Sequence, residues 1–458
     1  MATSFATVQT QARTLNACVI RSTLVAAVGG LLFGFDTAVI SGTTSALTNV
    51  FGLSPASLGW TVASAVWGTV LGSMVACWPG DRFGRRDSLR GLAILYVLSA
   101  LGCALAWNWS TLVVFRVIEG LAIGGSSVLG PMYIAEIAPA KWRGRLVAFF
   151  QFSIVLGILL AYVSNWGIRT FSLGATEWRW MLGISALPAA IFLPLLYSIP
   201  RSPRWLVKQR RIDEARNALE RLGEPDVEEE LRVIAATVAS SESSSQKLFS
   251  WEHRKPIMLA VLVALFNQVS GINAILYYAN YIFERAGFSG LSGDWQSMAI
   301  GATNLTATFL AMTVIDRIGR RTLLLFGSLA MVVCQGACAA LLYIGEYEQF
   351  LVIPLAAFIA CFAVSSGAVI WVYISEVFPN SVRAKGQSLG SFTHWITCAG
   401  LSLVFPMLAS TSPWIPFAFF ACMMLVQFVV VSRFFPETKG KTLEELQDEL
   451  GAAPSTVA

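Results

Sequence analysis

Residues 81–86 read DRFGRR and residues 316–321 read DRIGRR, so one motif occurs twice in the chain, 235 residues apart. Other features repeat at nearly the same distance: Glu136-x-x-Pro139 with Glu376-x-x-Pro379, Arg143 with Arg383, and Pro200 with Pro436. A repeat that covers half of a chain indicates two structurally similar halves. Repeats of six membrane spans are typical of transporters that move one half against the other, whereas a channel or a receptor does not need this symmetry.

The composition indicates a membrane protein. Of the 458 residues, 55% are hydrophobic and 13% are charged, and the mean hydropathy is +0.64. A soluble globular chain has about 25% charged residues, and apolar runs of about 18 residues or more predict membrane-spanning helices. We place twelve spans at 18–42, 57–79, 88–107, 111–136, 145–168, 178–199, 256–283, 296–315, 322–344, 350–376, 385–409 and 413–435. The predicted fold is therefore an all-α membrane protein with twelve transmembrane helices in two pseudo-symmetric six-helix bundles and a helical insert between them.

The expected domains follow from these spans. Residues 1–200 form the N-terminal six-helix bundle and residues 256–436 the C-terminal one. The polar segment 201–255 has the spacing of short amphipathic helices followed by a Ser-rich linker, and residues 437–458 form a tail.

The distribution of Lys and Arg predicts the orientation. The segments DRFGRRDSLR (81–90), PAKWRGR (139–145), DRIGRR and SVRAK (381–385) are basic, and all fall on one side in the twelve-span arrangement. Opposite loops such as 43–56 and 408–413 contain no Lys or Arg. Since basic loops stay in the cytoplasm, both termini and the insert are expected there, and the short outer loops fit a bacterial inner membrane.

Several functional classes are excluded. The eight Cys lie in apolar stretches and form no CxxC pair, which indicates neither a disulfide framework nor a metal site. With only two His and no nucleophile–base set or phosphate-binding loop, the sequence predicts no enzyme, cofactor, metal or nucleic-acid partner. No short apolar segment with an A-x-A-like cleavage site is present, so the first span is not expected to be a removable signal peptide.

Charged residues of both signs repeat beside the basic loops. Positive-inside topology alone would explain the Lys and Arg but not the repeated acids, because acids contribute little to orientation. The alternative is a salt-bridge latch between helix ends that closes the cytoplasmic side and breaks when that side opens. The predicted gate residues are Asp81, Arg82, Arg86, Glu136, Arg143, Asp316, Arg317, Arg321, Glu376 and Arg383, and the same motifs also contain Arg85 and Arg320.

Few ionisable residues lie well inside the predicted spans: Asp36, Arg116, Glu119 and His394. A charge at the bilayer centre costs at least ~2.5 kcal/mol, so each is a functional candidate. Asp36 lies six residues before the predicted outer end of the first span, and Arg116 six residues after the outer start of the fourth. Both should therefore lie about 9 Å below the same surface. The pair could load and release a proton, or it could be a static ion pair that fixes packing; buried pairs stabilise poorly, which favours coupling.

Uncharged polar side chains cluster in the seventh span, which reads FNQVSGINAILYYANYIF from Phe266. Asn267, Gln268, Asn273 and Tyr277 lie mid-span, and Gly271 allows that helix to bend. Gln151, Asn304, Trp371 and Trp395 in other spans extend the set. Each amide alone could be interhelical glue, but several amides with two indoles fit a neutral polyol such as a sugar better than an ion or a lipid.

Together these motifs resemble the sugar porter family of the major facilitator superfamily. DRFGRR, PMYIAEIAPAKWRGRL, PRSPRWL, NQVSGINAILYY, DRIGRR, ISEVFP and FPETKGKTLEEL occur in the family's order, and LLFGFDTAVISG is similar to bacterial sugar–proton symporters. The resemblance implies sugar contacts at Gln151, Gln268, Asn273 and Asn304, with Asn267 where Gln is usual, aromatic walls at Trp371 and Trp395, and a proton-coupling pair of Asp36 and Arg116.

Three departures from the family pattern change the expectations. Arg201 replaces the Glu of P-E-S-P-R and should loosen the closed inner gate, and Ala368 removes a helix-breaking proline from the tenth span. His394 stands where Asn or Gln is usual, so it either binds sugar or titrates near neutral pH. At position 158 this chain has Ile, as many glucose facilitators do, whereas xylose transporters have Gln there. This favours glucose as the substrate.

The sequence thus predicts a hexose importer, with glucose as the sugar, that works by alternating access and proton symport through Asp36 and Arg116. Its partners are a monosaccharide, protons and the lipid bilayer. An uncoupled uniporter, with Asp36 as a structural partner of Arg116, is the first alternative. A sugar sensor that does not transport is the second, disfavoured by the short tail.

Overall fold

The computed structural model describes residues 15–243, 247–314, 317–379 and 382–441, together with residues 445, 446 and 450. In this part of the chain all regular secondary structure is helical. The first group of helices is α1 (Ala17–Val39), α2 (Thr44–Phe51), α3 (Pro55–Val75), α4 (Cys77–Arg82), α5 (Arg85–Ala104), α6 (Trp109–Ile137), α7 (Arg143–Thr170), α8 (Glu177–Gly183) and α9 (Ala186–Leu195). The insert contains α10 (Pro203–Lys208), α11 (Ile212–Arg221) and α12 (Val227–Ser243). The second group is α13 (Arg254–Val269), α14 (Ile272–Tyr277), α15 (Ala279–Arg285), α16 (Gly290–Val314), α17 (Arg320–Ile344), α18 (Val352–Val364), α19 (Ser366–Val377), α20 (Arg383–Thr411) and α21 (Ile415–Phe434).

The predicted transmembrane architecture is confirmed. Among the described residues, 11 helical segments are long and apolar enough to cross a membrane. The twelfth is α16, whose 25 residues give a length of about 37 Å. The first predicted span, 18–42, is too short, because helical structure continues from α1 through a 3₁₀ turn and α2 to Phe51.

Helix starts coincide with local sequence signals. Asn16, Ser54 and Asn108 each cap a helix by accepting a hydrogen bond from the backbone N–H three residues later. Ser54 is followed by Pro55, which suits a first helical turn because its missing N–H needs no partner there.

Two predicted spans are broken in the middle. The seventh is interrupted at Gly271, whose φ of 83° is readily adopted only by glycine, and a β-carbon there would also meet the ring of Phe420. The tenth changes direction at Ser365, between α18 and α19. The tenth span is therefore broken although Ala368 replaces the proline expected there.

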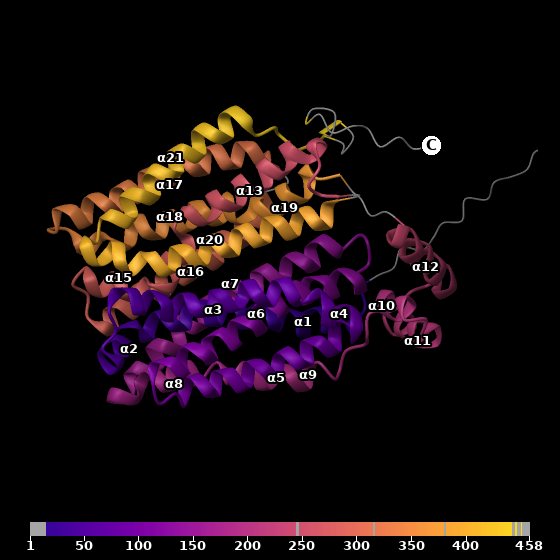
Figure 1. The fold of residues 1–458 in the computed structure, drawn as a ribbon, viewed down its shortest axis with the longest axis horizontal. Helices are drawn as coiled ribbons and strands as arrows, with labels where there is room; N and C mark the ends of the chain where they lie inside the picture. The colour runs from indigo at the N-terminus through magenta and orange to yellow at the C-terminus, as the bar shows by residue number, and fades with distance from the viewer. Residues whose placement is uncertain are drawn as a thin grey trace, which may run out of the picture.

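The helices form two groups that face each other across the molecule (Figure 1). Within the first group α3 packs on α6 and α1 on α7, and Gly120 lets α6 approach the carbonyl of Ala65 on α3 closely. The two groups meet through α3 with α20 and α7 with α16. We call the end of the molecule that carries α10–α12 the insert face and the other end the opposite face.

The insert helices pack on one another around a small apolar cluster. Trp205, Leu206, Ala215, Leu219 and Leu231 form most of its buried part. Figure 1 shows α10, α11 and α12 together at one end of the helix groups, beyond α4.

Candidate functional site

A fully buried cluster of three charged residues lies inside the first helix group. Arg116 and Glu119 stand one turn apart on α6, and Asp36 faces them from α1; the three are 1%, 2% and 4% exposed. Arg116 Nη1 donates to Asp36 Oδ1, and the same nitrogen donates to Glu119 Oε2 at 2.9 Å. Asp36 and Arg116, which were predicted to lie at the same depth, are thus in contact, and Glu119 contacts the same arginine.

Asp36 also borders a small cavity that reaches the second helix group. Phe33, Asp36 and Thr37 of α1 line it together with Tyr277 of α14. Tyr277 is one of the predicted sugar-binding residues, so this cavity connects the charge cluster with one residue of the predicted sugar site.

The amides of the seventh span form one hydrogen-bonded group around Gln268. Its Nε2 lies 3.2 Å from Asn267 Oδ1 and its Oε1 accepts from Asn273 Nδ2 at 3.1 Å. The same Nε2 lies 3.0 Å from a ring nitrogen of His394 on α20. Asn267 in turn donates to the carbonyl of Ser366, at the start of α19. Two helix breaks, at Gly271 and Ser365, therefore bring these polar groups together.

Aromatic rings surround this amide group. His394 lies 5.2 Å from Trp371 on α19 and 4.8 Å from Trp395, measured between ring centroids. Trp395 contacts Phe33 of α1 at 5.3 Å, which joins the two helix groups beside the cavity at Asp36. A flat apolar face next to several amides can hold a sugar ring by stacking and by hydrogen bonds to its hydroxyls.

The two remaining predicted sugar contacts stand apart from the amide group. Gln151 of α7 is exposed and Asn304 of α16 is buried. Neither is hydrogen-bonded to the amides of α13 and α14 in the described structure. Their helices, α7 and α16, pack against each other where the two groups meet.

On the insert face, the first helix group carries an ion-pair network around α5. Arg85 bonds Asp81 at 3.2 Å and Glu136 at 3.0 Å. Asp81 also pairs with Lys208 of α10, which ties the insert to this group. Arg82 instead stacks on aromatic rings, with its guanidinium 5.5 Å from the Trp78 ring centroid.

The second helix group repeats this arrangement. Arg320 Nη2 bonds Glu376 at 3.1 Å, as Arg85 bonds Glu136. Arg321 donates to the carbonyl of Ser432, and the carbonyl of Arg317 accepts from Lys439. Asp316 lies outside the described residues.

In this conformation the partners of Glu136 and Glu376 are Arg85 and Arg320 of their own helix groups, and no ion pair is described for Arg143 or Arg383. Arg383 Nε and Nη2 are buried without a hydrogen-bond partner. The ion pairs described on the insert face each lie within one helix group or tie the insert to the first group.

The opposite face is closed by a buried network that the sequence reasoning missed. Arg169 of α7 bonds Asp294 of α16 at 2.6 Å, and Asp294 accepts from Asn280 of α15. Ser41 donates to Asn280 at 2.8 Å, and Ser45 donates to Glu284. The bonds of Arg169, Ser41 and Ser45 cross between the two groups, whereas the Asn280–Asp294 bond lies within the second group. Arg169 and Asp294 have opposite charge near the same ends of the fifth and eighth spans, a signal equivalent to the one that paired Asp36 with Arg116.

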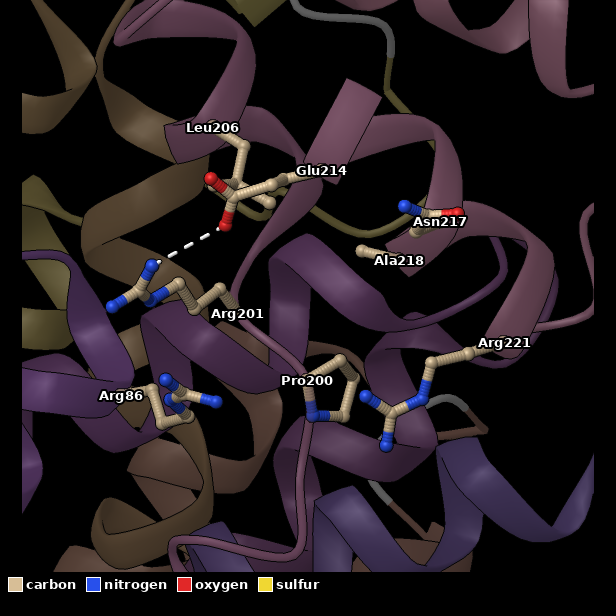
Figure 2. A pocket seen from close by; sticks show the side chains of 8 residues that line it. All are labelled: Arg86, Pro200, Arg201, Leu206, Glu214, Asn217, Ala218 and Arg221. Atoms are coloured by element: carbon tan, nitrogen blue, oxygen red, sulfur yellow. Dashed lines mark hydrogen bonds and ion pairs between the residues drawn. The ribbon is translucent and has the colours of Figure 1, made fainter. Parts of the chain in front are cut away.

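Arg201, the departure from the family signature, has ion partners of its own. It bonds Asp87 of α5 at 2.9 Å and Glu214 of α11 at 3.4 Å. A hydrogen bond from Arg211 lowers the pKa of the exposed Glu214 carboxyl below its ordinary value, so this acid stays charged. Figure 2 shows Arg201 with Arg86 and Arg221 around a cavity of about 190 Å³ between α5 and the insert.

This arrangement of two repeated helix groups, closed at one face around a buried charge cluster and a polar–aromatic site, defines a multi-pass membrane transporter. A family model described as "Sugar (and other) transporter" matches residues 22–450. The chain belongs to this sugar transporter family of the major facilitator superfamily, and its members are transporters, not enzymes.

Individual relatives agree over nearly the whole length. The D-xylose-proton symporter of Escherichia coli is 36% identical over 464 residues, covering 93% of this chain and 94% of that protein. The arabinose-proton symporter of Bacillus subtilis is 37% identical, with 94% of each chain covered. The solved inward-open conformation of the Escherichia coli xylose transporter has a TM-score of 0.84 at 34% identity, covering 94% of this chain and 99% of that one.

Proposed function

We propose that this protein is a proton-coupled importer of a monosaccharide that works by alternating access. The observation that carries the proposal is the cavity at Asp36: a buried carboxylate bonded to Arg116 borders the same space as Tyr277 beside the amide group. Proton occupancy and sugar occupancy can therefore influence each other over a short distance. The names of the symporter relatives support the same coupling.

In the proposed cycle a proton neutralises Asp36 while the opposite face is open. Sugar then binds among Gln151, Asn267, Gln268, Asn273, Tyr277, Asn304, Trp371, His394 and Trp395. The two groups rock, the opposite face closes through Arg169 and Asp294, and the ligands leave through the insert face. We assign the present structure to the final stage of this cycle, an assignment supported by the bonds that close the opposite face and by the similarity to the inward-open xylose transporter.

We further propose that the insert face and both termini are cytoplasmic, that the membrane is the bacterial inner membrane, and that residues 1–200 and 256–436 are the two moving bodies. Arg and Lys on the insert face support this orientation. Reporter fusions at the two ends that are active only outside the cytoplasm should both be silent.

Glucose is the sugar we expect, because the buried Ile158 of α7 is the residue of many glucose facilitators at a position where xylose transporters have Gln. The named relatives transport pentoses, so the substrate panel must include xylose and arabinose beside glucose and galactose. A site that hydrogen-bonds a specific hydroxyl rejects a sugar that lacks it.

The test is uptake of each labelled sugar into proteoliposomes with an imposed inward proton gradient. Accumulation above the equilibrium level that a protonophore abolishes is the expected result. Uptake that reaches only the equilibrium level, unchanged by the protonophore, identifies a uniporter. Binding without uptake or exchange would identify a sugar sensor.

A further inference from the structure

Glu119 is the third charged group of the buried cluster, and its role depends on the proton coupling proposed above. Asp36 and Glu119 accept hydrogen bonds from the same atom, Arg116 Nη1. Arg116 Nε is buried without a hydrogen-bond partner, and both bonds to the carboxylates come from Nη1. The two carboxyl groups therefore compete for one cation in a region with almost no exposure.

The charge balance of the cluster changes with each proton. With both acids ionised, the three groups carry a net charge of −1. When a proton from water binds a carboxylate oxygen of Asp36, an O–H bond forms and the cluster becomes neutral. Without Glu119 the same step would leave Arg116 as a buried cation with no ionised partner, which is strongly unfavourable.

We propose that Glu119 is the counter-ion that Arg116 retains when Asp36 takes up the transported proton. Glu119 is then a positioning residue: it does not carry the transported proton, and it makes loading of Asp36 possible at a higher pH. Its place one turn from Arg116 on the same helix keeps this partner in reach through the cycle.

Other titratable groups face the cluster from neighbouring helices. Tyr96 and Cys103 of α5 lie next to it, and the Cys103 thiol donates to Glu119 Oε2 at 3.6 Å. Tyr277 of α14 faces Asp36 across the cavity. A phenol and a thiol can donate hydrogen bonds, but neither supplies a negative charge to Arg116 at physiological pH. Glu119 is thus the group suited to replace Asp36 as its counter-ion.

The test compares gradient-driven sugar accumulation by wild-type protein and Glu119→Gln across a series of external pH values. We expect the half-maximal point of the mutant to move toward acid by about one pH unit or more, a tenfold change in proton concentration. Glu119→Asp, which keeps the charge, should move it less. The matched control is Glu346→Gln, the same change at an exposed position outside the cluster.

Sugar exchange at equal concentrations on both sides reports whether each variant still folds and moves. Normal exchange with an acid-shifted profile supports the proposal. Normal exchange with an unchanged profile overturns it, and so does loss of exchange in Glu119→Gln that Glu119→Asp does not restore, because Glu119 would then be structural. If the proposed proton-coupled transport itself were wrong, the result would be different, because wild-type protein would then show no gradient-driven accumulation at any pH.

Discussion

At the scale of single residues, the Asp36–Arg116 contact tests the proposed coupling directly. Asp36→Asn keeps the size of the side chain and removes the titrating group. The mutant should exchange sugar at a rate near that of wild type but fail to concentrate it against a gradient. Exchange and net accumulation in the same proteoliposomes measure both properties, and a mutant that still concentrates sugar would rule out the coupling role.

Gln268 offers a second test at this scale, because it connects Asn267, Asn273 and His394. Gln268→Ala should raise the KM for sugar at least about tenfold, since a lost hydrogen bond and an unsatisfied buried partner together exceed about 1.4 kcal/mol. Gln427→Ala is the control, because Gln427 is an equally buried amide on α21 outside this group. Equal KM values for the two variants would place the sugar elsewhere.

The sequence located these residues but not all their contacts. Depth along a helix follows from a constant rise per residue, which is why Asp36 and Arg116 could be paired. Which arginine of D-R-x-G-R-R meets Glu136 depends on where the helix restarts. Gly84, with a φ of 90°, lies between α4, which ends at Arg82, and α5, which begins at Arg85; after this turn Arg85 bonds the acid and Arg82 does not. Only the backbone conformation at that glycine decides this.

At the scale of elements, the broken seventh span is the feature that brings the amide group together. Gly271→Ala would place a β-carbon at a φ of 83° and against the Phe420 ring. We expect a loss of stability of about 1–3 kcal/mol, because a non-glycine residue is strained in that conformation. The measurement is the thermal unfolding midpoint of detergent-solubilised protein, together with sugar affinity.

The matched control is Gly336→Ala in the interior of α17, where a β-carbon would meet no neighbouring atom within 4 Å. Alanine favours a helix over glycine by about 1 kcal/mol, so this variant should be as stable as wild type or more so. If both substitutions had the same effect, the bend at Gly271 would not need glycine.

The break in the tenth span shows where sequence reasoning about elements fails. Without the family's proline, Ala368 predicts a continuous helix, yet Ser365 has φ −110° and ψ −97° and separates α18 from α19. Its hydroxyl donates to the carbonyl of Cys361, one turn earlier, and so supplies a local partner where the helix ends. Because this break is stabilised by a side-chain hydrogen bond and by packing, no proline marks it in the sequence.

At the scale of the whole molecule, contacts on the two faces should stabilise opposite conformations of the alternating-access equilibrium. The closed opposite face depends on the Arg169–Asp294 pair, whose acid is 1% exposed. On the insert face Arg383 has no hydrogen-bond partner for two of its nitrogens, and we expect it to bond an acid of the other helix group when that face closes. Weakening either contact should therefore shift the populations of the two conformations in opposite directions.

Alkylation of Gln151→Cys by a membrane-impermeant reagent applied only from the insert face measures this shift, because the reagent reaches the exposed position 151 only while that face is open. The exposed thiols Cys77 and Cys422 are first replaced by Ser to remove background. Asp294→Asn should slow the reaction and Arg383→Ala should accelerate it, each by about fivefold or more, since a change of about 1 kcal/mol suffices for that factor. Asp213→Asn, at an exposed position on the insert, should leave the rate unchanged.

Because the two gate variants are expected to act with opposite signs, a general loss of stability cannot mimic the result. Equal shifts in one direction would show that the two faces do not belong to a single alternating equilibrium.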